Sequence, residues 1–286
     1  LEANPDDLTP DYIAMLRTLP FNRLSMGIQT FNESILKVLQ RRHTARQAIE
    51  AFQNCRAAGF QNISIDLMYG LPGETLSTWQ QDLDQALLLH PEHLSAYHLI
   101  YEEDTVLWKL REQHKVEEAD EDLSVSLFST LIDRLTSEGY DHYEISNFSL
   151  PGLYSRHNSS YWTEKKYLGC GPSAHSYNGV SRQWNVASLD TYIKGISAGT
   201  PVFEIEELDL YTRYNDFVIT RIRTEWGMPL SKLRDEFGEK LYDYCLRMAA
   251  PHLKQGTLEL VNDILKLTRK GIFISDGIMS DMLWTD

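Results

Sequence analysis

Three apolar stretches rich in β-forming residues stand out along the chain, at residues 22–29, 62–70 and 93–100. Two amphipathic stretches with a helical period lie between them. The first, within residues 44–60, ends at Gly59, which suits a left-handed helix cap; the second, over 77–89, starts with Ser77 and Gln80 in the spacing of a capping box. Strands and helices in this order, with strands about 30 to 40 residues apart, predict right-handed βαβ units and a parallel sheet.

The first two predicted strands carry a polar face. Gly27 and Gln29 alternate with apolar residues in one strand, as Asp66 does in the next. A parallel strand buried on both faces reads as an almost continuous apolar run, so one face of this sheet is expected to meet solvent or a ligand. Sites in such sheets and barrels lie at the carboxyl ends of the strands, which predicts a site around Gln29, the segment 66–68 with the YGLPG loop, and residues 99–100.

The composition of the sequence changes after the third predicted strand. An acidic segment, EEADED, precedes an amphipathic helix predicted over about residues 122–138. Residues 140–185 are dense in Tyr, Trp, His, Gly and Asn with little helical period, as in a binding surface built from loops and short strands. A helix predicted near 188–198 leads to the Gly-Thr-Pro sequence at 199–201, which we interpret as a linker.

The last part of the chain is helical and then β. Helices are predicted across 207–224, after the segment GMPLS and near 239–254, and TLELVNDILKLTRKGIFISD reads as two strands around a turn, as in a winged-helix module. Residues 204–286 carry 11 Lys and Arg against 15 Asp and Glu, so packing or partner docking is expected here rather than DNA binding. The predicted parts are a sheet-and-helix part, an aromatic extension and a winged-helix-like part, at residues 1–138, 139–203 and 204–286.

Composition sets limits on this picture. Of 286 residues, 42% are apolar and 24% are charged, which is typical of a folded globular chain and excludes a disordered or collagen-like one. The formal net charge of −14 opposes binding to phosphate backbones, so nucleic acid is not an expected partner. No apolar run reaches the roughly 20 residues that span a bilayer and no secretory signal stands before the first pattern, so we expect no transmembrane segment and a cytoplasmic location.

The cysteines offer little chemistry by their spacing. Cys55, Cys170 and Cys245 stand far apart without a CxxC, which predicts neither a disulfide framework nor a thiolate metal site. Cys170 and His175 share a Gly-rich loop but lack a third group that would orient a nucleophilic pair. No catalytic residue is assigned from these patterns.

The segment SRHNSSYW brings together His157, Asn158, Tyr161 and Trp162. A neutral imidazole flanked by large aromatic rings can ligate the iron of a flat macrocycle while the rings stack on it. A hydrogen-bonded histidine beside core aromatics is the alternative, and on local sequence alone it is the simpler one. His157 is the candidate iron ligand if the first interpretation holds.

Seven blocks of the chain resemble, in order, the oxygen-independent coproporphyrinogen III oxidase-like family of radical S-adenosylmethionine (SAM) proteins. The HNxxYW pattern and the short C-terminal module are more similar to the heme-chaperone branch of that family than to its oxidases. The resemblance covers nearly the whole chain. The blocks are ANPDDL, NRLSMGIQTFNESILKVLQRRHT, NISIDLMYGLPGET, HLSAYHLIYEEDT, HYEISNFSLPG, SRHNSSYW and YLGCGPSAHSYNG.

The resemblance implies an α/β fold, a partial (β/α)6 barrel in which a CxxxCxxC motif holds a 4Fe–4S cluster and SAM binds the open iron. This sequence contains no CxxxCxxC, so the cluster cysteines are absent from it, and its opening LEANPDD is interpreted as interior to a longer barrel whose first strands are lacking. The family's SAM contacts correspond to Glu2, Gln29, Arg41, Asp66, Met68 and Ile100, and its heme-binding residues to His157, Asn158, Tyr161 and Trp162.

The function that the resemblance implies is that of a heme chaperone, which binds heme and transfers it to acceptor proteins. The alternative is an oxygen-independent coproporphyrinogen III oxidase, a dehydrogenase that decarboxylates coproporphyrinogen III to protoporphyrinogen IX. A third interpretation, from the residues alone, is an ordinary barrel enzyme with Asp66 and Glu102 as acid and base. Whether the chain is an enzyme is left open, because radical chemistry is not expected without the CxxxCxxC segment.

Overall fold

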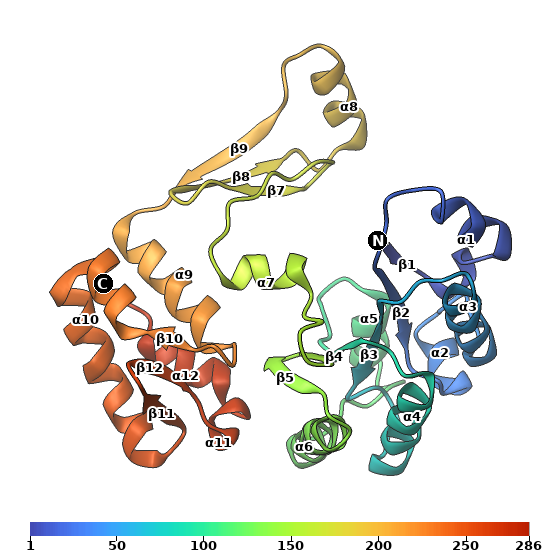
Figure 1. The fold of residues 1–286 in the computed structure, drawn as a ribbon, viewed down its shortest axis with the longest axis horizontal. Helices are drawn as coiled ribbons and strands as arrows, with labels where there is room; N and C mark the ends of the chain where they lie inside the picture. Colours follow the sequence, from blue (N-terminus) through green and yellow to red (C-terminus); the bar gives the residue numbers. More distant parts are fainter. Residues whose placement is uncertain (286) are drawn as a thin grey trace. The chain divides into compact units, whose positions relative to one another are not determined.

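Figure 1 shows the computed structural model of the chain, which describes residues 1–285. Its contacts divide it into two compact units, Leu1–Tyr154 and Ser155–Asp286, and each is described by itself. The first unit contains a mixed sheet with a parallel core, and the second contains two small antiparallel sheets. Within residues 1–285, no helix combines the length and the apolar character that crossing a bilayer requires.

A six-stranded sheet forms the centre of the first unit. Neighbouring strands run parallel from β1 to β4 and antiparallel from β4 through β6 to β5. Its three predicted strands are confirmed as β2, β3 and β4. In spatial order the strands are β1 (Glu2–Ala3), β2 (Leu24–Gln29), β3 (Ile63–Tyr69), β4 (His93–His98), β6 (Asn147–Ser149) and β5 (Asp141–Glu144).

Helices follow the parallel strands along the chain. The predicted amphipathic stretches are confirmed as α3, α4 and α6. The predicted capping box of α4 is wrong, because Thr75 rather than Ser77 is the N-cap and its side chain accepts from the backbone N–H of Thr78. The helices are η1 (Pro5–Asp7), α1 (Pro10–Leu16), α2 (Glu33–Val38), α3 (Ala45–Ala57), α4 (Leu76–Leu89), α5 (Val106–Glu112) and α6 (Glu121–Ser137).

The two faces of the parallel sheet differ as the alternation predicted. Leu24, Met26 and Ile28 of β2 are fully buried, whereas the residues between them are only half-buried. Helices α3 and α6 contact β2 and β3, and the buried indole of Trp79 in α4 donates to the backbone oxygen of Leu127 in α6 at 3.0 Å. The helices therefore cover the apolar face, which leaves the polar face to build a site.

The second unit begins with α7 (Arg156–Trp162). An antiparallel sheet follows, made of β7 (His175–Tyr177), β8 (Ser181–Asn185) and β9 (Phe203–Glu207), with α8 (Leu189–Ser197) between the last two strands. The remainder consists of α9 (Leu210–Ile222), β10 (Met228–Pro229), α10 (Leu230–Gln255), β11 (Leu258–Val261), β12 (Ile264–Leu267), α11 (Arg269–Ile272) and α12 (Ser275–Met282).

The predicted C-terminal strand pair is confirmed as β11 and β12, which β10 extends to a three-stranded sheet. The two helices predicted on either side of residue 238 are confirmed; they meet at a kink at Gly238, where φ is 78° and ψ is 171°, and together make up α10. Only a glycine adopts these values readily, so the kink is set by the sequence. The order of elements, helices α9 and α10 followed by the β11–β12 hairpin, is the winged-helix-like order that the sequence predicted.

The predicted part boundaries differ from the contacts of the structure. A boundary at 203/204 cuts β9, which pairs with β8 along its length. The segment 199–201, interpreted as a linker, connects α8 to β9 inside one unit. The other boundary, at 138/139, separates β5 and β6 from the sheet in which they lie. All five residues of β9 are exposed, so this strand has no alternation of buried and exposed positions by which the sequence could reveal it.

Candidate functional site

Arg41 is the centre of a polar cluster at the carboxyl ends of β1 and β2. Its Nη2 donates to the Asn4 Oδ1 at 2.9 Å and to the backbone oxygen of Gly27 at 2.8 Å. Its Nε is buried and has no hydrogen-bond partner among residues 1–285. A guanidinium with an unused buried donor fits an added carboxylate, because carboxylates accept paired hydrogen bonds from arginine.

The side chain of Gln29 lies over Gly27, on the same side as Arg41, at the irregular end of β2. The register with β3 shifts between Gly27 and Gln29, and Gln29 adopts a φ of 71°. A Cβ added at Gly27 would stand 3.0 Å from the Gln29 Nε2 and 3.5 Å from the Arg41 Nη2. A side chain at this position would press on the amide end of Gln29, so glycine leaves room for both polar groups.

Asp66 lies in the middle of the polar face. The Ser25 hydroxyl donates to its Oδ1 at 3.2 Å. Burial raises the pKa of Asp66 to about 6, although hydrogen bonds from Ser95 and Ser25 act in the opposite direction. The charge of Glu2 also raises the pKa of Asp66, so the two carboxylates interact. Since Glu2 is exposed and stands in register with Ser25, it places a second carboxylate at the rim of the same face.

Met68 and Ile100 supply apolar surface near these groups. Met68 follows Asp66 by two residues on β3, so both point to the same face. It is half-buried and packs against a cluster of buried residues that includes Leu71 and Leu99. Ile100 comes directly after that cluster and is 71% exposed, so the protein itself leaves this side chain uncovered. The two residues are suited to flank an apolar or aromatic part of a ligand.

A carboxylate that the sequence analysis did not single out holds the loop after β3. The Glu74 Oε2 accepts from the backbone N–H groups of Gly70 at 2.7 Å and Leu71 at 3.3 Å, while its buried Oε1 has no partner within residues 1–285. Burial raises the pKa of Glu74 to about 7 in spite of these bonds. The sequence feature that could have pointed to Glu74 is an acidic residue four positions after Gly70, the glycine that ends β3.

A buried hydrogen-bond chain lies deeper in the same sheet and was also missed. The Ser64 hydroxyl is 2.8 Å from the His93 Nδ1, and the His93 Nε2 is 2.6 Å from the Tyr143 hydroxyl. Burial lowers the pKa of His93 to about 3, with a smaller contribution from the charge of Arg23. His93 is therefore neutral at physiological pH and works as a structural link rather than as a proton carrier.

Helix α7 positions the HNxxYW residues in the second unit. The Ser155 hydroxyl caps the helix by accepting from the backbone N–H of Asn158. His157 is exposed, and its Nε2 lies 3.2 Å from the Tyr161 hydroxyl, with the two rings edge to face at 5.1 Å. The spacing of four residues puts both rings on one side of the helix. The structure thus brings an accessible imidazole and an aromatic ring together.

Trp162 lies on the more buried side of α7. The Arg223 guanidinium covers its ring at 4.2 Å, and its Nε1 is buried without a hydrogen-bond partner within residues 1–285. Tyr161 and Trp162 line a cavity of about 160 Å³, here called the motif cavity. Its other lining residues are Glu164, Lys165, Tyr167, Tyr177, Arg182, Asp216 and Thr220. Aromatic walls with polar groups at the edge suit part of an amphipathic ring ligand.

The three cysteines do not fit an iron–sulfur cluster. Cys55 and Cys245 are buried in different units, and burial raises the pKa of each thiol to about 11. Cys170 is exposed and unpaired. Within residues 1–285 no three Cys, His, Asp or Glu side chains are grouped as metal ligands. Cluster ligation needs thiolates, so no step through a cluster is derived from these residues.

Comparison with known proteins identifies the family. A model of the radical SAM superfamily matches residues 1–86, and a model of the HemN C-terminal domain matches residues 208–274. The heme chaperone HemW of Bacillus subtilis is 30% identical over 284 residues, which cover 99% of this chain and 75% of that protein. The heme chaperone HemW of Lactococcus lactis is 32% identical over 289 residues, covering 100% of this chain and 75% of that protein.

A solved structure has the same fold. The coproporphyrinogen III oxidase HemN of Escherichia coli, a radical SAM enzyme, superposes with a TM-score of 0.81 over 98% of this chain and 68% of that one, at 22% identity. Likeness at this identity shows the fold, here the radical-SAM-type α/β fold that the resemblance implied. The HemW relatives, which match nearly the whole of this chain, and the two family models establish that the chain belongs to the HemN-like radical SAM family, in its HemW heme-chaperone branch.

Proposed function

We propose that this protein binds heme at α7 and passes it to acceptor proteins, with His157 as the iron ligand. The observation that carries the proposal is the exposed imidazole of His157 beside Tyr161 and the motif cavity. The names of the HemW relatives support the same function. Asn158 and Trp162 complete the binding set, Asn158 in the first turn of the helix and Trp162 as the wall of the cavity.

The hydrogen bond to Tyr161 fixes how His157 meets iron. The Tyr161 hydroxyl lies 3.2 Å from Nε2 and orients the ring; when Nε2–H donates to that hydroxyl, Nδ1 keeps its lone pair for iron. A neutral imidazole with one nitrogen held and the other open is the form that ligates iron. An exposed ligand also suits a carrier, since bound heme stays within reach of an acceptor.

We further propose that the carboxyl ends of β1–β4 bind SAM. Arg41 pairs with the SAM carboxylate, and the unused Nε of Arg41 supports this. Asp66 accepts from ribose hydroxyls, Gln29 adds an amide, and Glu2 accepts from the ammonium group. Met68 and Ile100 flank the adenine. A bound SAM would supply radical chemistry only together with a 4Fe–4S cluster, and the part of this chain's own residues would be to bind and orient SAM.

The oxidase alternative has weaker support. Its argument is the likeness to the coproporphyrinogen III oxidase, which at 22% identity concerns the fold alone. An anaerobic assay with SAM and coproporphyrinogen III, on a reconstituted protein that includes the CxxxCxxC segment, decides between the two: protoporphyrinogen formation would favour the oxidase. We propose a cytoplasmic setting because all three cysteines are free, as is usual in reducing compartments.

Titration of ferric heme into the full chain tests the proposal. We expect a saturable shift of the Soret band at one heme per chain that is lost in His157→Ala. His114→Asn is the matched control, because His114 is exposed with a φ of 53°, a conformation that asparagine tolerates. Wild-type protein without saturable binding, or with equal binding in His157→Ala, would contradict the proposal.

A further inference from the structure

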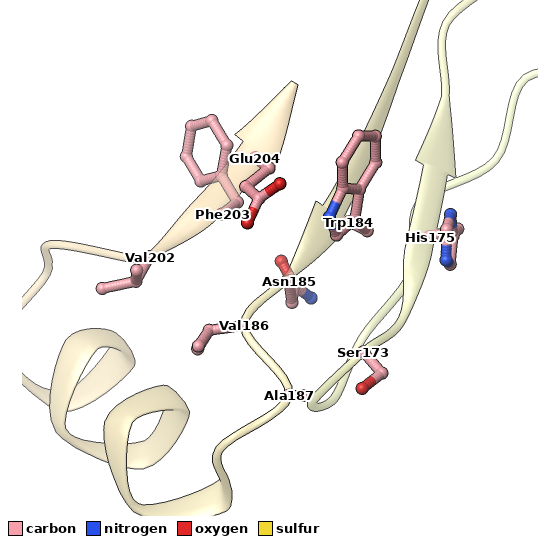
Figure 2. Close-up of a pocket in the computed structure, with 9 residues that line it drawn as sticks. All are labelled: Ser173, His175, Trp184, Asn185, Val186, Ala187, Val202, Phe203 and Glu204. Atoms are coloured by element: carbon pink, nitrogen blue, oxygen red, sulfur yellow. The ribbon is translucent and has the colours of Figure 1, made fainter. Parts of the chain in front are cut away.

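A second, larger cavity lies over the sheet of β7, β8 and β9. Its volume is about 340 Å³, within the usual range for small-molecule sites of roughly 300 to 1,000 Å³. Figure 2 shows Trp184 on β8 between Phe203 on β9 and His175 on β7. We call it the sheet cavity; its lining residues are Ser173, His175, Trp184, Asn185, Val186, Ala187, Val202, Phe203 and Glu204.

The strand register places much of this lining on one face of the sheet. His175 pairs with Trp184, and Trp184 pairs with Glu204. Residues directly opposite in antiparallel strands point to the same face, so these three form a row. The next row contains Val186, whose backbone N–H donates to Val202 at 3.1 Å. The floor of the sheet cavity is thus a regular surface rather than a gap between loops.

The same face continues into the motif cavity. Tyr177 lies two residues after His175 on β7, and Arg182 lies two residues before Trp184 on β8, so both point to the same face as the Trp184 row. Tyr177 and Arg182 pair with each other and line the motif cavity. Tyr177 also forms a bridge with Tyr167, whose ring packs against Tyr161 of α7 at 4.9 Å. The two cavities therefore lie on neighbouring rows of one sheet face, and a chain of aromatic rings leads from α7 toward Trp184.

The chemistry of the sheet cavity suits a flat ring. The rings of His175 and Trp184 are stacked, with centroids 5.9 Å apart and planes inclined by 29°. Val186 and Val202 continue this surface with apolar groups, and Val202 is 46% exposed although apolar. Flat aromatic ligands bind by stacking on such surfaces and by removing apolar area from water.

We infer that the sheet cavity binds the macrocycle of a tetrapyrrole independently of its iron, as an extension of the site on α7. The inference rests on the proposed heme-binding function. One edge of the ring lies over Trp184, while the opposite part reaches the motif cavity, which Tyr161 and Trp162 of α7 line.

Charge sets the orientation of the ring. Glu204 closes the Trp184 row with a carboxylate, which repels the propionate groups of a tetrapyrrole. Arg182 is already paired with Asp216. Lys165 lines the motif cavity, is exposed and makes no ion pair within residues 1–285, so it is the cation available to a propionate. The propionates therefore point toward Lys165 and away from Glu204.

Binding of iron-free protoporphyrin IX to the full chain, followed by porphyrin fluorescence, tests the inference. Without iron, His157 has nothing to ligate, so His157→Ala is expected to weaken protoporphyrin IX binding much less than Trp184→Ala does. Trp184→Ala is expected to weaken binding about 10-fold, the usual scale of a lost stacking contact. Val202→Asp, at a half-exposed position, gives a second loss without disturbing the core. Gln183→Ala is the control, since Gln183 neighbours Trp184 on β8 and faces the opposite side.

The outcomes separate this inference from the proposed function. If ferric heme does not bind to wild-type protein at all, the proposed function fails. If ferric heme binds but protoporphyrin IX does not, or if folded Trp184→Ala and Val202→Asp bind protoporphyrin IX as wild type does, the inference is overturned. Loss of protoporphyrin IX binding in His157→Ala would also overturn it, because the ring would then depend on α7 alone.

Discussion

Replacing Asp66 by Asn is predicted to stabilise the first unit while weakening SAM binding. Burial raises the pKa of Asp66 from 3.8 to about 6, so folding disfavours its charged form. A shift of about two units corresponds to about 3 kcal/mol, and partial solvent contact and the hydrogen bond from Ser25 reduce the expected gain to about 1–3 kcal/mol. Asn keeps the shape and the acceptor oxygen but cannot ionise, so it avoids this cost.

The pH dependence of this effect has a definite sign. Well below pH 3.8 both the folded and the unfolded chain carry a protonated Asp66, so wild type and variant have similar stability. As the pH rises from about 4 through about 6, the unfolded chain releases its proton first, and wild type loses stability that Asp66→Asn retains. The gap therefore opens across this window and is complete above pH 7.

Hydrogen exchange of peptides from β2 and β3, measured by mass spectrometry in urea, reads the stability of the first unit separately from the second. Asp104→Asn is the matched control, because Asp104 is exposed in the same unit and its φ of 64° suits asparagine. Slower exchange in Asp66→Asn at pH 7.5, with almost no gap near pH 3, is expected. Equal or faster exchange at pH 7.5 would refute the claim that burial of the charged Asp66 carboxylate destabilises the first unit.

Three further predictions follow from named contacts. Gly70→Ala places a Cβ 2.6 Å from the His98 Nε2 at a φ of 73°, so we expect a loss of about 1–3 kcal/mol, seen as a lower urea midpoint for β3 peptides. Arg41→Lys loses the planar fork, which predicts about 10-fold weaker SAM binding by calorimetry with unchanged folding. Burial raises the pKa of Glu164, but hydrogen bonds from Lys232 and Arg221 outweigh this effect and lower it. Glu164→Gln is therefore expected to lower the free energy of unfolding by about 1 kcal/mol at pH 7, and this difference from wild type closes as the pH falls through the acid range. An unchanged thermal midpoint at pH 7 would contradict this.

The parallel sheet could be predicted because its signal is local. Alternation in residues 24–29 and 63–69 marks the buried and polar faces, and the end of each strand then marks the site. Strand β9 could not be found in this way, because its residues are exposed on both faces and its Glu-rich sequence reads as a helix start or a linker. The misplaced part boundary at 203/204 has the same cause.

The polar network of the site is harder to predict from sequence. His93 meets Tyr143 across 50 residues, and only the pairing of β4 with β6, and of β6 with β5, brings them together. Glu74 is local to its loop, but its buried position depends on the packing around Leu71 rather than on a motif. By contrast, His157 and Tyr161 could be paired in advance, since a spacing of four puts them on one helix face.

Heme transfer tests the central claim most directly. The full chain, loaded with one equivalent of ferric heme, is mixed with apomyoglobin, and the holomyoglobin spectrum is followed in wild type and His157→Ala. The account predicts that wild type binds heme and delivers it in a single phase that becomes independent of acceptor concentration, because release from His157 sets the rate. A His157→Ala variant that loads and delivers heme as wild type does, or a wild type that never loads, would contradict it.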